Sequence, residues 1–301
     1  MKGDKKEVLA GIVTYNPDVK VLIQNILCLY KQNTKVLVVD NGSSNYREIM
    51  AASINYQVEL ILNGRNFGIA AALNTIGEYA FNNNYKWFLT LDQDTIVSEN
   101  LVNTLLDLST EHERTGIVAP YINRKGDYVS SYATKKVPVV ITSGSLTNTN
   151  VWKKIGGFWE FLFIDEVDHD YCYRLNKNGY SIFQTDRVKV DHRIGNQSTK
   201  KILFHTFHPT NHSAFRRYYE TRNSIIMAHL YPDEKEPFHH RYFMIIRIFI
   251  SVLCCESDKK NKIRSMLKGI NDANKWLINN KDKNSDNYFK YKYDKYYCSY
   301  L

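Results

Sequence analysis

YKWFLTLDQDT, residues 85–95, is an apolar, β-prone stretch that ends on two carboxylates, Asp92 and Asp94. Bulky and β-branched residues favour a buried strand, whereas an Asp there is costly to desolvate unless a cation compensates its charge. Because side chains alternate along a strand with a period of two, both carboxylates point to the same side. There they would offer hard oxygen ligands to Mg²⁺ or Mn²⁺. The stretch therefore predicts a divalent-metal site at the end of a buried strand.

The sequence around this strand alternates between short β-rich runs and helical stretches such as residues 19–30 and 69–81. Such alternation predicts an α/β fold with a mostly parallel sheet that is covered by helices on both faces. The β-rich runs between residues 7 and 120 read VLAGIVTY, KVLVVD, VELIL, KWFLTLD and GIVAP. Ligands of such sheets bind at the carboxyl ends of the strands, where Thr14, Asp40 and the Asp pair fall.

The pattern continues with a predicted strand over residues 137–146, a short helix near Val151, and a helix over residues 165–177. The last of these ends at Asn178-Gly179, a favourable left-handed helix ending. We therefore expect a catalytic domain over residues 1–203, a helical region over 204–280, and a polar tail rich in Tyr and Lys over 281–301.

The helical region contains an apolar run, residues 242–255, which Arg247 interrupts. A membrane span needs about 20 mostly apolar residues, so this run is too short. We expect one helix with Arg247 opposite its apolar face. Such a helix packs against a neighbour or lies on a membrane surface.

Charge and cysteine content narrow the class of protein. The formal charge of +9 on 301 residues indicates attraction to anions, but no nucleic-acid module is visible, so we expect no nucleic-acid partner. The five cysteines lack metal-ligand spacing, and their odd number favours reduced thiols. The opening MKGDKKEVLAGIV has too short an apolar stretch for a signal peptide, so we expect a cytoplasmic protein.

An isolated Asp-x-Asp has other interpretations, because both carboxylates could cap the loop or the helix that begins near Ser98. Haloacid-dehalogenase phosphatases also place Asp-x-Asp after an apolar strand, but with a Thr two residues beyond the second Asp. Here Ile96 holds that place and Thr95 comes one residue early. Sugar nucleotidyltransferases begin with a Gly-rich loop, where this chain has TYNPD. Both alternatives are weakened.

Several motifs, in order, resemble those of family 2 inverting glycosyltransferases of the GT-A fold, and within them those of bacterial rhamnosyltransferases. They lie in residues 7–195, with a looser match in YYETRNS, and read IVTYNPD, VVDNGSS, NGRNFGIAAALN, LDQDT, IDEVDHDYCYRLNKNGY and HRIG. The resemblance implies transfer of a sugar, L-rhamnose from dTDP-L-rhamnose, to a cell-surface polysaccharide or a lipid-linked glycan precursor. Another pyrimidine-nucleotide sugar, such as UDP-galactofuranose or a UDP-hexose, is the alternative donor.

The resemblance also implies which residues bind the donor. Thr14 and Asn16 end the first strand where the family holds the nucleotide, and Asp40 matches the carboxylate that bonds the pyrimidine ring. Asp40 also has a simpler interpretation as a turn former before Asn41-Gly42. The other implied donor-binding positions are Arg65, Gly68, Asp92 and Gly144.

The implied metal is Mn²⁺ or Mg²⁺, held by Asp92, Asp94 and His192. His192 begins a His-x-x-Gly pattern that ends at Gly195, and a neutral imidazole suits such a cation. The cation would neutralise the diphosphate of the donor as it leaves.

The implied catalytic base is Asp168, which matches the family position counted back from Arg174, while Asp170 matches a second, structural acid. A base is needed to take the proton of the acceptor hydroxyl. Asp165 shares a helical face with Asp168 and is its rival. Acids clustered in a first helical turn would also simply complement the helix dipole. The implied acceptor-side residues, which could equally be packing residues, are Asp165, Tyr219, Arg222 and Asn223.

Lipid-linked acceptors lie at membranes. We therefore expect peripheral contact with the inner face of the cell membrane, and a homodimer is a further expectation.

Overall fold

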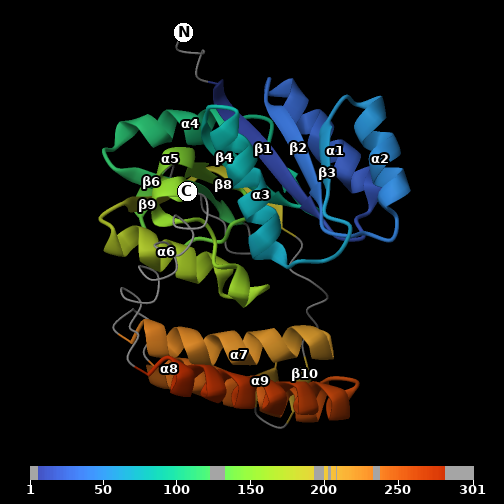
Figure 1. Ribbon diagram of the computed structural model, residues 1–301, viewed down its shortest axis with the longest axis vertical. Coiled ribbons are helices and arrows are strands. Elements are labelled where there is room, and N and C mark those ends of the chain that lie inside the picture. Colours follow the sequence, from blue (N-terminus) through green and yellow to red (C-terminus); the bar gives the residue numbers. More distant parts are fainter. Residues whose placement is uncertain are drawn as a thin grey trace. The chain divides into compact units, whose positions relative to one another are not determined.

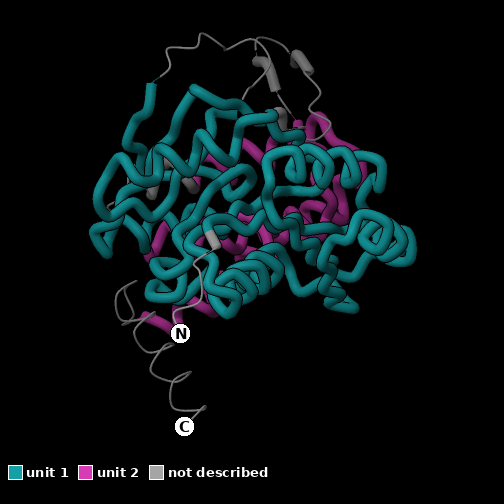
Figure 2. The backbone as a smooth tube through the Cα atoms, turned by 90° about the horizontal axis from the view of Figure 1, so that it is seen from above, with its two compact units in different colours: residues 1–163, 167–193 teal, residues 164–166, 194–301 magenta. Residues whose placement is uncertain are grey.

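The computed structural model describes residues 6–122, 133–192, 200–202, 205–207, 209–232 and 238–281. The chain divides into two compact units, coloured separately in Figure 2. The first comprises Met1–Phe163 and Val167–Arg193, and the second Ile164–Glu166 and Ile194–Leu301. The second unit thus begins at Ile194 and also contains Ile164–Glu166, and the predicted domain boundary at residue 203 stays a prediction. The predicted tail lies, apart from residue 281, outside the described residues.

A mixed sheet forms the centre of the first unit (Figure 1). Its strand order is β3-β2-β1-β4-β8-β6-β9-β5, and β7 pairs with β9. Strands β1 to β4 pair in parallel, as do β6 and β9, whereas β8, β5 and β7 run antiparallel to their neighbours. The strands are β1 Lys6–Thr14, β2 Lys35–Asp40, β3 Glu59–Leu62, β4 Tyr85–Asp92, β5 Thr95–Val97, β6 Thr115–Ile122, β7 Thr134–Lys136, β8 Ser145–Asn148 and β9 Ser181–His192. The expected α/β fold is confirmed.

Helices of this unit pack on the sheet through apolar faces. In α1, for example, Leu22, Ile26 and Leu29 are fully buried in the core, and the side chain of Asp18 caps the helix by accepting from the Lys20 N–H. The helices are α1 Val19–Lys31, α2 Tyr46–Asn55, α3 Ile69–Asn82, α4 Leu101–Glu111, α5 Thr149–Ile155 and α6 Val167–Lys177, with a 3₁₀ turn at Glu160–Leu162.

Two predicted elements differ in extent because of backbone conformation. The predicted strand over residues 137–146 is replaced by β8, which begins only at Ser145, since the preceding residues form a turn in which Gly144 has φ +82° and the Ser145 N–H donates to the Thr142 carbonyl at 3.1 Å. Helix α6 begins at Val167 because Asp165 and Glu166 have φ of +61° and +66°, outside the right-handed helical region.

The second unit consists of helices α7 Ala214–Leu230, α8 Phe238–Cys255 and α9 Lys259–Asn279 and a hairpin of β10 Lys200–Ile202 with β11 His205–Phe207. Within the described residues, none of the helices has the length and apolar character that crossing a membrane requires. The expectation of a single apolar face on α8 was wrong. Ile245 and Val252 are buried, whereas Ile246 and Ile250 are exposed on the side where Arg247 also lies.

A buried charge network holds the second unit together. The Glu256 carboxylate, which is inaccessible to solvent, accepts hydrogen bonds from Arg217 and, at 2.9 Å, from the ammonium of Lys262. Arg217 also donates to Glu220 at 2.6 Å and to the Thr210 hydroxyl at 3.0 Å. Burying charges is tolerable only when they are paired in this way.

Glu256→Ala is expected to lower the free energy of unfolding by about 3–5 kcal/mol, because buried Lys262 would lose the anion it pairs with and buried Arg217 would lose one of its two. The matched control is Glu111→Ala, since Glu111 pairs at 3.4 Å with Arg187 and both side chains are exposed. That change should cost less than about 1 kcal/mol. Urea unfolding measures both values. Equal losses of unfolding free energy would show that the buried network stabilises the protein no more than an exposed ion pair.

Candidate active site

The register of the sheet brings three of the predicted site residues together at the carboxyl ends of neighbouring strands. Thr14 pairs with Asp40 across β1 and β2, and Val13 pairs with Asp92 across β1 and β4. Because these strands are parallel, their carboxyl ends meet at the same place. The structure therefore brings Thr14, Asp40 and Asp92 together, as the sequence predicted.

Asp40 is almost fully buried, and both of its carboxylate oxygens accept hydrogen bonds. One accepts from the hydroxyls of Thr14, at 3.0 Å, and Ser43; the other accepts from the N–H groups of Gly42, at 3.2 Å, and Ser43, at 2.9 Å. In the structure, Asp40 therefore shapes the turn after β2. Its contact with a pyrimidine ring stays a prediction.

Asn16 ties the end of β1 to the same turn. Its side-chain oxygen accepts from the N–H and the hydroxyl of Ser44, both at 2.8 Å, and its own N–H donates to the Ser43 hydroxyl at 2.7 Å. The neighbouring N–H of Tyr15 donates to the side chain of Gln93 at 2.7 Å. The loop after β1 is thus fixed to both neighbouring loops of the edge.

Asn41, which the sequence suggested only as a turn residue, connects two loops of the site. Its amide donates at 3.0 Å to the Asn66 side chain and to the Gly68 carbonyl, and its oxygen accepts from the Phe67 N–H at 3.1 Å. Arg65 is exposed in the same loop, and its guanidinium lies 4.3 Å from the centroid of the Phe67 ring. A cation at the rim of the edge suits an anionic ligand.

Gly68 occupies a position that only glycine fits. It has φ +90°, and a Cβ there would lie 2.6 Å from the carbonyl oxygen of Phe163. The next N–H, that of Ile69, donates to the same oxygen at 2.7 Å. The start of α3 is therefore packed directly on the segment that leads to α6.

Gly68→Ala is expected to lower the free energy of unfolding by more than about 2 kcal/mol, through backbone strain and the steric clash with Phe163. Gly64→Ala is the matched control, because Gly64 has φ +70° but nothing within 4 Å of a Cβ. The control should show the strain alone, about 1 kcal/mol. Thermal and urea unfolding compare the two; a cost no larger for Gly68 would contradict the packing argument.

Of the two carboxylates proposed for the metal, Asp92 ends β4 and Asp94 lies in the turn before β5, and both are partly exposed. The N–H of Asp92 donates to the Ser143 hydroxyl at 3.1 Å, and that hydroxyl lies 2.6 Å from the buried Thr95 hydroxyl. In β5 and β9, Thr95 pairs with His192, so the backbone of His192 lies opposite the neighbour of Asp94. The side chain of His192 and the whole of Gly195 lie outside the described residues.

The described side chains fit a hard divalent cation, because Asp92 and Asp94 offer two partly exposed carboxylates. Both precede β5, which pairs with β9, the strand that ends at His192. Among the described side chains, no three His, Cys, Asp or Glu groups converge as a complete metal site. Mn²⁺ or Mg²⁺ binding therefore stays a prediction.

Gly144 lies beside Ser143 at this edge. A Cβ on it would come within 3.0 Å of the Pro120 ring and 3.1 Å of the Val190 side chain. Its positive φ and this crowding explain the glycine without a ligand, so the close approach of a donor sugar stays a prediction.

Asp170 has the structural role that the sequence suggested. Its fully buried carboxylate accepts from Nε of Arg174 at 3.0 Å and from an Nη at 2.6 Å. Arg174 also donates to the carbonyls of Ile155 at 3.2 Å and Gly157 at 2.8 Å. This pair fixes α6 to the loop after α5.

Asp168 lies in the first turn of α6, and its side chain is 22% exposed. Its oxygen accepts from the backbone N–H of His169 at 2.9 Å and lies 3.1 Å from Nδ1 of that ring. Burial raises the pKa of Asp168, but the hydrogen bonds and charge of His169 outweigh it, so the pKa lies below its ordinary value. Asp168 is therefore an ionised, accessible carboxylate at neutral pH.

Asp165, the rival base, is engaged by a cation within the second unit. Arg216 donates to its two oxygens at 2.8 and 3.2 Å. Burial raises the pKa of Asp165 in spite of this guanidinium. A carboxylate held in such a fork is poorly placed to accept a proton from a substrate. Arg216, which the sequence analysis missed, thereby separates the roles of the two acids.

The predicted acceptor-side residues make packing contacts within the second unit. The amide of Asn223, which is fully buried, donates to the carbonyls of Ile164 at 2.8 Å and Asp165 at 3.1 Å. Nε of Arg222 donates to the Asn223 oxygen at 2.9 Å, and its guanidinium lies 4.8 Å from the Tyr219 ring centroid. Their contact with an acceptor stays a prediction.

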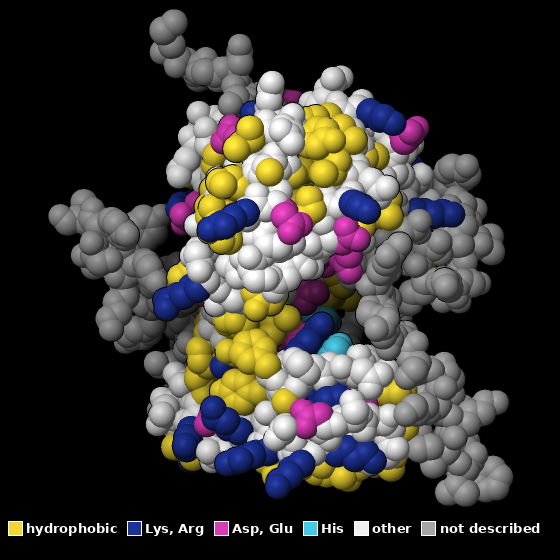
Figure 3. All heavy atoms as spheres, turned by 90° about the vertical axis from the view of Figure 1, so that its right-hand side faces the viewer, with side chains coloured by type: hydrophobic (Ala, Val, Ile, Leu, Met, Phe, Trp, Pro, Cys, Tyr) yellow, Lys and Arg dark blue, Asp and Glu magenta, His cyan; other side chains and the backbone are white. Residues whose placement is uncertain are grey.

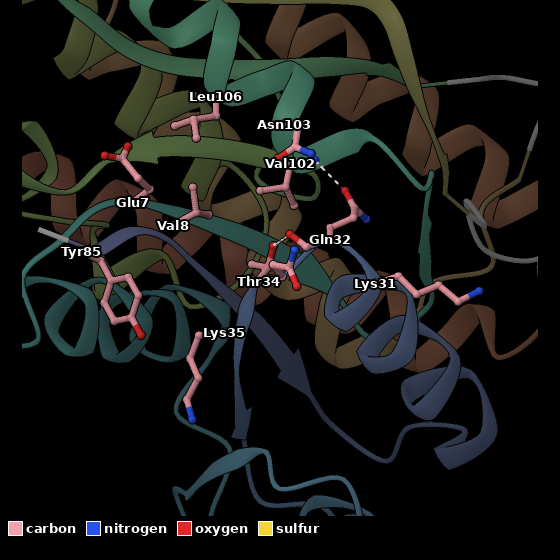
Figure 4. Close-up of a pocket in the computed structure, with 11 residues that line it drawn as sticks. Glu7, Val8, Lys31, Gln32, Thr34, Lys35, Tyr85, Val102, Asn103 and Leu106 are labelled. Carbon is pink, nitrogen blue, oxygen red and sulfur yellow. Dashed lines mark hydrogen bonds between the residues drawn. The ribbon is translucent and has the colours of Figure 1, made fainter.

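A pocket of about 450 Å³ lies at the other end of the strands, near the amino ends of β1, β2 and β4 (Figure 4). Lys35 and Tyr85 line it, together with Gln32, whose oxygen accepts from the Val102 N–H at 3.0 Å. Since ligands of such sheets bind at the carboxyl ends, this pocket is not the candidate active site.

Two comparisons with known sequences match more than half of the chain. A family model described as Glycosyl transferase family 2 matches residues 10–175. The dTDP-rhamnosyl transferase RfbF of Shigella flexneri is 30% identical over 282 residues, which cover 87% of this chain and 93% of RfbF.

Two solved structures share the fold. Mannosyltransferase PcManGT from Pyrobaculum calidifontis, in complex with GDP-Man and Mn²⁺, matches with a TM-score of 0.57 and 13% identity, over 92% of this chain and 76% of its own. TarS residues 1–349 of S. aureus, in complex with UDP-GlcNAc, match with a TM-score of 0.51 and 15% identity, over 88% and 80%. On the family model and the likeness to RfbF, the chain belongs to glycosyl transferase family 2 and has the GT-A fold of these enzymes.

Proposed function

We propose that this glycosyltransferase is an inverting rhamnosyltransferase, which moves L-rhamnose from dTDP-L-rhamnose to a cell-surface polysaccharide or its lipid-linked precursor. The observation that carries the choice of sugar is the 30% identity to dTDP-rhamnosyl transferase RfbF over 87% of the chain. The donor would bind where Thr14, Asp40 and Asp92 lie together, and the parallel register of β1, β2 and β4 supports this choice.

In the proposed reaction, Asp168 takes the proton of an acceptor hydroxyl as that oxygen attacks the anomeric carbon of rhamnose. The bond from that carbon to the diphosphate oxygen breaks, and dTDP leaves from the opposite face, which inverts the anomeric centre. Asp168 suits this role because its pKa lies below its ordinary value and its side chain is accessible.

Asp92 and Asp94 would hold the divalent cation, with His192 as the third ligand. Bound there, Mn²⁺ or Mg²⁺ supplies positive charge that neutralises the leaving diphosphate. Arg65, exposed on the loop before α3, would add a second positive charge beside the donor.

A UDP sugar, such as UDP-galactofuranose or a UDP-hexose, is the second candidate donor. Asp40 could accept from the ring N–H of thymine or uracil alike. The nucleobase of the donor therefore does not distinguish dTDP-L-rhamnose from a UDP sugar. The family assignment leaves the phosphatase alternative without support.

A thermal-shift screen of nucleotide sugars, with and without Mn²⁺, tests the donor. A ligand that binds only the folded state raises the melting temperature, by an amount that grows with its affinity. We expect the largest metal-dependent rise with dTDP-L-rhamnose. A larger rise with UDP-galactofuranose would move the assignment to that sugar.

We also place the enzyme in the cytoplasm, in peripheral contact with the inner face of the membrane, where a lipid-linked acceptor would be presented. A homodimer is part of the same proposal.

A further inference from the structure

Helix α8 exposes an apolar stripe that no described residue covers. Phe243, Ile246, Ile250 and Leu253 recur at spacings of three and four residues, so they lie along one face of the helix. Between 41% and 57% of each is exposed. The opposite side of the helix provides the contacts to the rest of the unit, since Ile245 and Val252 are buried. Exposed stripes of this kind mark interaction surfaces.

Helix α9 exposes a face that is both basic and apolar. Leu267 and Ile278, 55% and 70% exposed, alternate along it with cations. Its buried residues are Met266, Gly269 and Ala273. The exposed cations of α9 are Lys259, Lys260, Arg264, Lys268 and Lys275.

The two faces belong to neighbouring helices of the second unit. Helices α8 and α9 are joined by a short turn, contact each other and both pack against α7 (Figure 1). Arg247 is exposed next to the apolar stripe, where a long cationic side chain can keep its charge in water. Figure 3 shows Lys and Arg side chains with apolar side chains among them on the surface of this unit.

Acidic groups of this helix pair are kept away from that surface. Glu256 is buried with Arg217 and Lys262, and Asp272 accepts from the hydroxyl of Tyr218 on α7 at 2.9 Å. Among the described residues of α8, α9 and the turn between them, Asp258 in the turn is the only exposed acid. The surface is therefore apolar and strongly positive at once.

We propose that this α8–α9 surface, with Phe243, Ile246, Ile250 and Leu253 as its apolar part and the cations around Arg264 as its basic part, docks on an anionic lipid bilayer. Apolar side chains enter the boundary of the acyl chains while the cations contact acidic headgroups. The proposal deepens the proposed function. It rests on that function in one respect, which is that docking on the bilayer would bring the enzyme to a lipid-linked acceptor.

The test is co-sedimentation of the purified full chain with vesicles of phosphatidylglycerol and phosphatidylcholine, and with phosphatidylcholine alone. We expect binding to the anionic vesicles at low ionic strength and its loss at high salt, because screening removes the headgroup attraction. Binding equally strong to phosphatidylcholine alone, or none to anionic vesicles at low ionic strength, would overturn the proposal.

A pair of double variants makes the test specific. Ile250→Ser with Arg264→Gln should weaken partitioning at least about 20-fold, from the lost apolar groups and one lost cation. Ile54→Ser with Arg47→Gln is the control, since both residues are exposed on α2 of the first unit, and it should partition like the unchanged chain. Equal weakening in both would contradict the assignment to α8 and α9.

Two further measurements distinguish membrane docking from self-association and from loss of donor binding. If sedimentation velocity shows a dimer that the α8–α9 variant abolishes, and vesicle binding is unchanged, the surface joins copies of the chain and the proposal fails. The Mn²⁺-dependent thermal shift with dTDP-L-rhamnose, measured without vesicles, should be the same in all variants. A chain that binds vesicles without any donor response would disprove the proposed function alone.

Discussion

Asp168→Asn is expected to transfer sugar about 10²–10⁴-fold more slowly than the unchanged enzyme while it binds donor and metal almost normally. The amide keeps the shape of the side chain and its acceptor oxygen toward His169, but it cannot take a proton from the acceptor hydroxyl. Release of dTDP in the presence of acceptor measures the rate, and calorimetry measures donor binding.

Asp165→Asn is the matched control, because Asp165 lies on the same short segment but is held by Arg216. It should retain far more activity than Asp168→Asn. If Asp165→Asn is inactive and Asp168→Asn turns over at nearly the normal rate, the base has been assigned to the wrong carboxylate.

Asp94→Ala is expected to weaken Mn²⁺-dependent donor binding by at least about 100-fold, since even residues that only orient metal ligands change affinity by 10–100-fold. The fold should persist, because Asp94 is partly exposed at the end of the sheet. His192→Ala should act in the same direction.

Asp107→Ala is the control for charge alone, since Asp107 is an exposed acid on α4. Isothermal titration with dTDP and Mn²⁺ compares the variants. Unchanged metal-dependent binding in Asp94→Ala would remove this residue from the metal site.

The sequence predicted elements whose signals are local. The apolar runs that became β1, β2 and β4 and the helical periods of α1 and α3 could be assigned because each pattern lies within one element. The register that joins Thr14, Asp40 and Asp92 then follows from parallel pairing, so this edge of the site was predictable too.

The parts that were not predicted depend on distant contacts or unusual backbone conformation. Asp165 and Glu166 adopt positive φ although neither is glycine, and the Asn223 amide binds the carbonyls of this segment from α7. Arg216 pairs with Asp165 from far along the chain, which no local pattern reveals. The residues of α8 are apolar on both sides, so periodicity alone could not show which side is buried.

Calorimetric titration of the purified chain with dTDP-L-rhamnose, dTDP-glucose and UDP-galactofuranose, each with Mn²⁺ and with EDTA, tests the proposed donor and its metal most directly. dTDP-glucose shares the nucleotide and differs in the sugar, so the comparison isolates recognition of rhamnose. We expect that dTDP-L-rhamnose with Mn²⁺ binds most tightly and that EDTA costs at least about tenfold, or 1.4 kcal/mol. Equal affinity for the three donors, or binding that is indifferent to metal, would contradict the assignment.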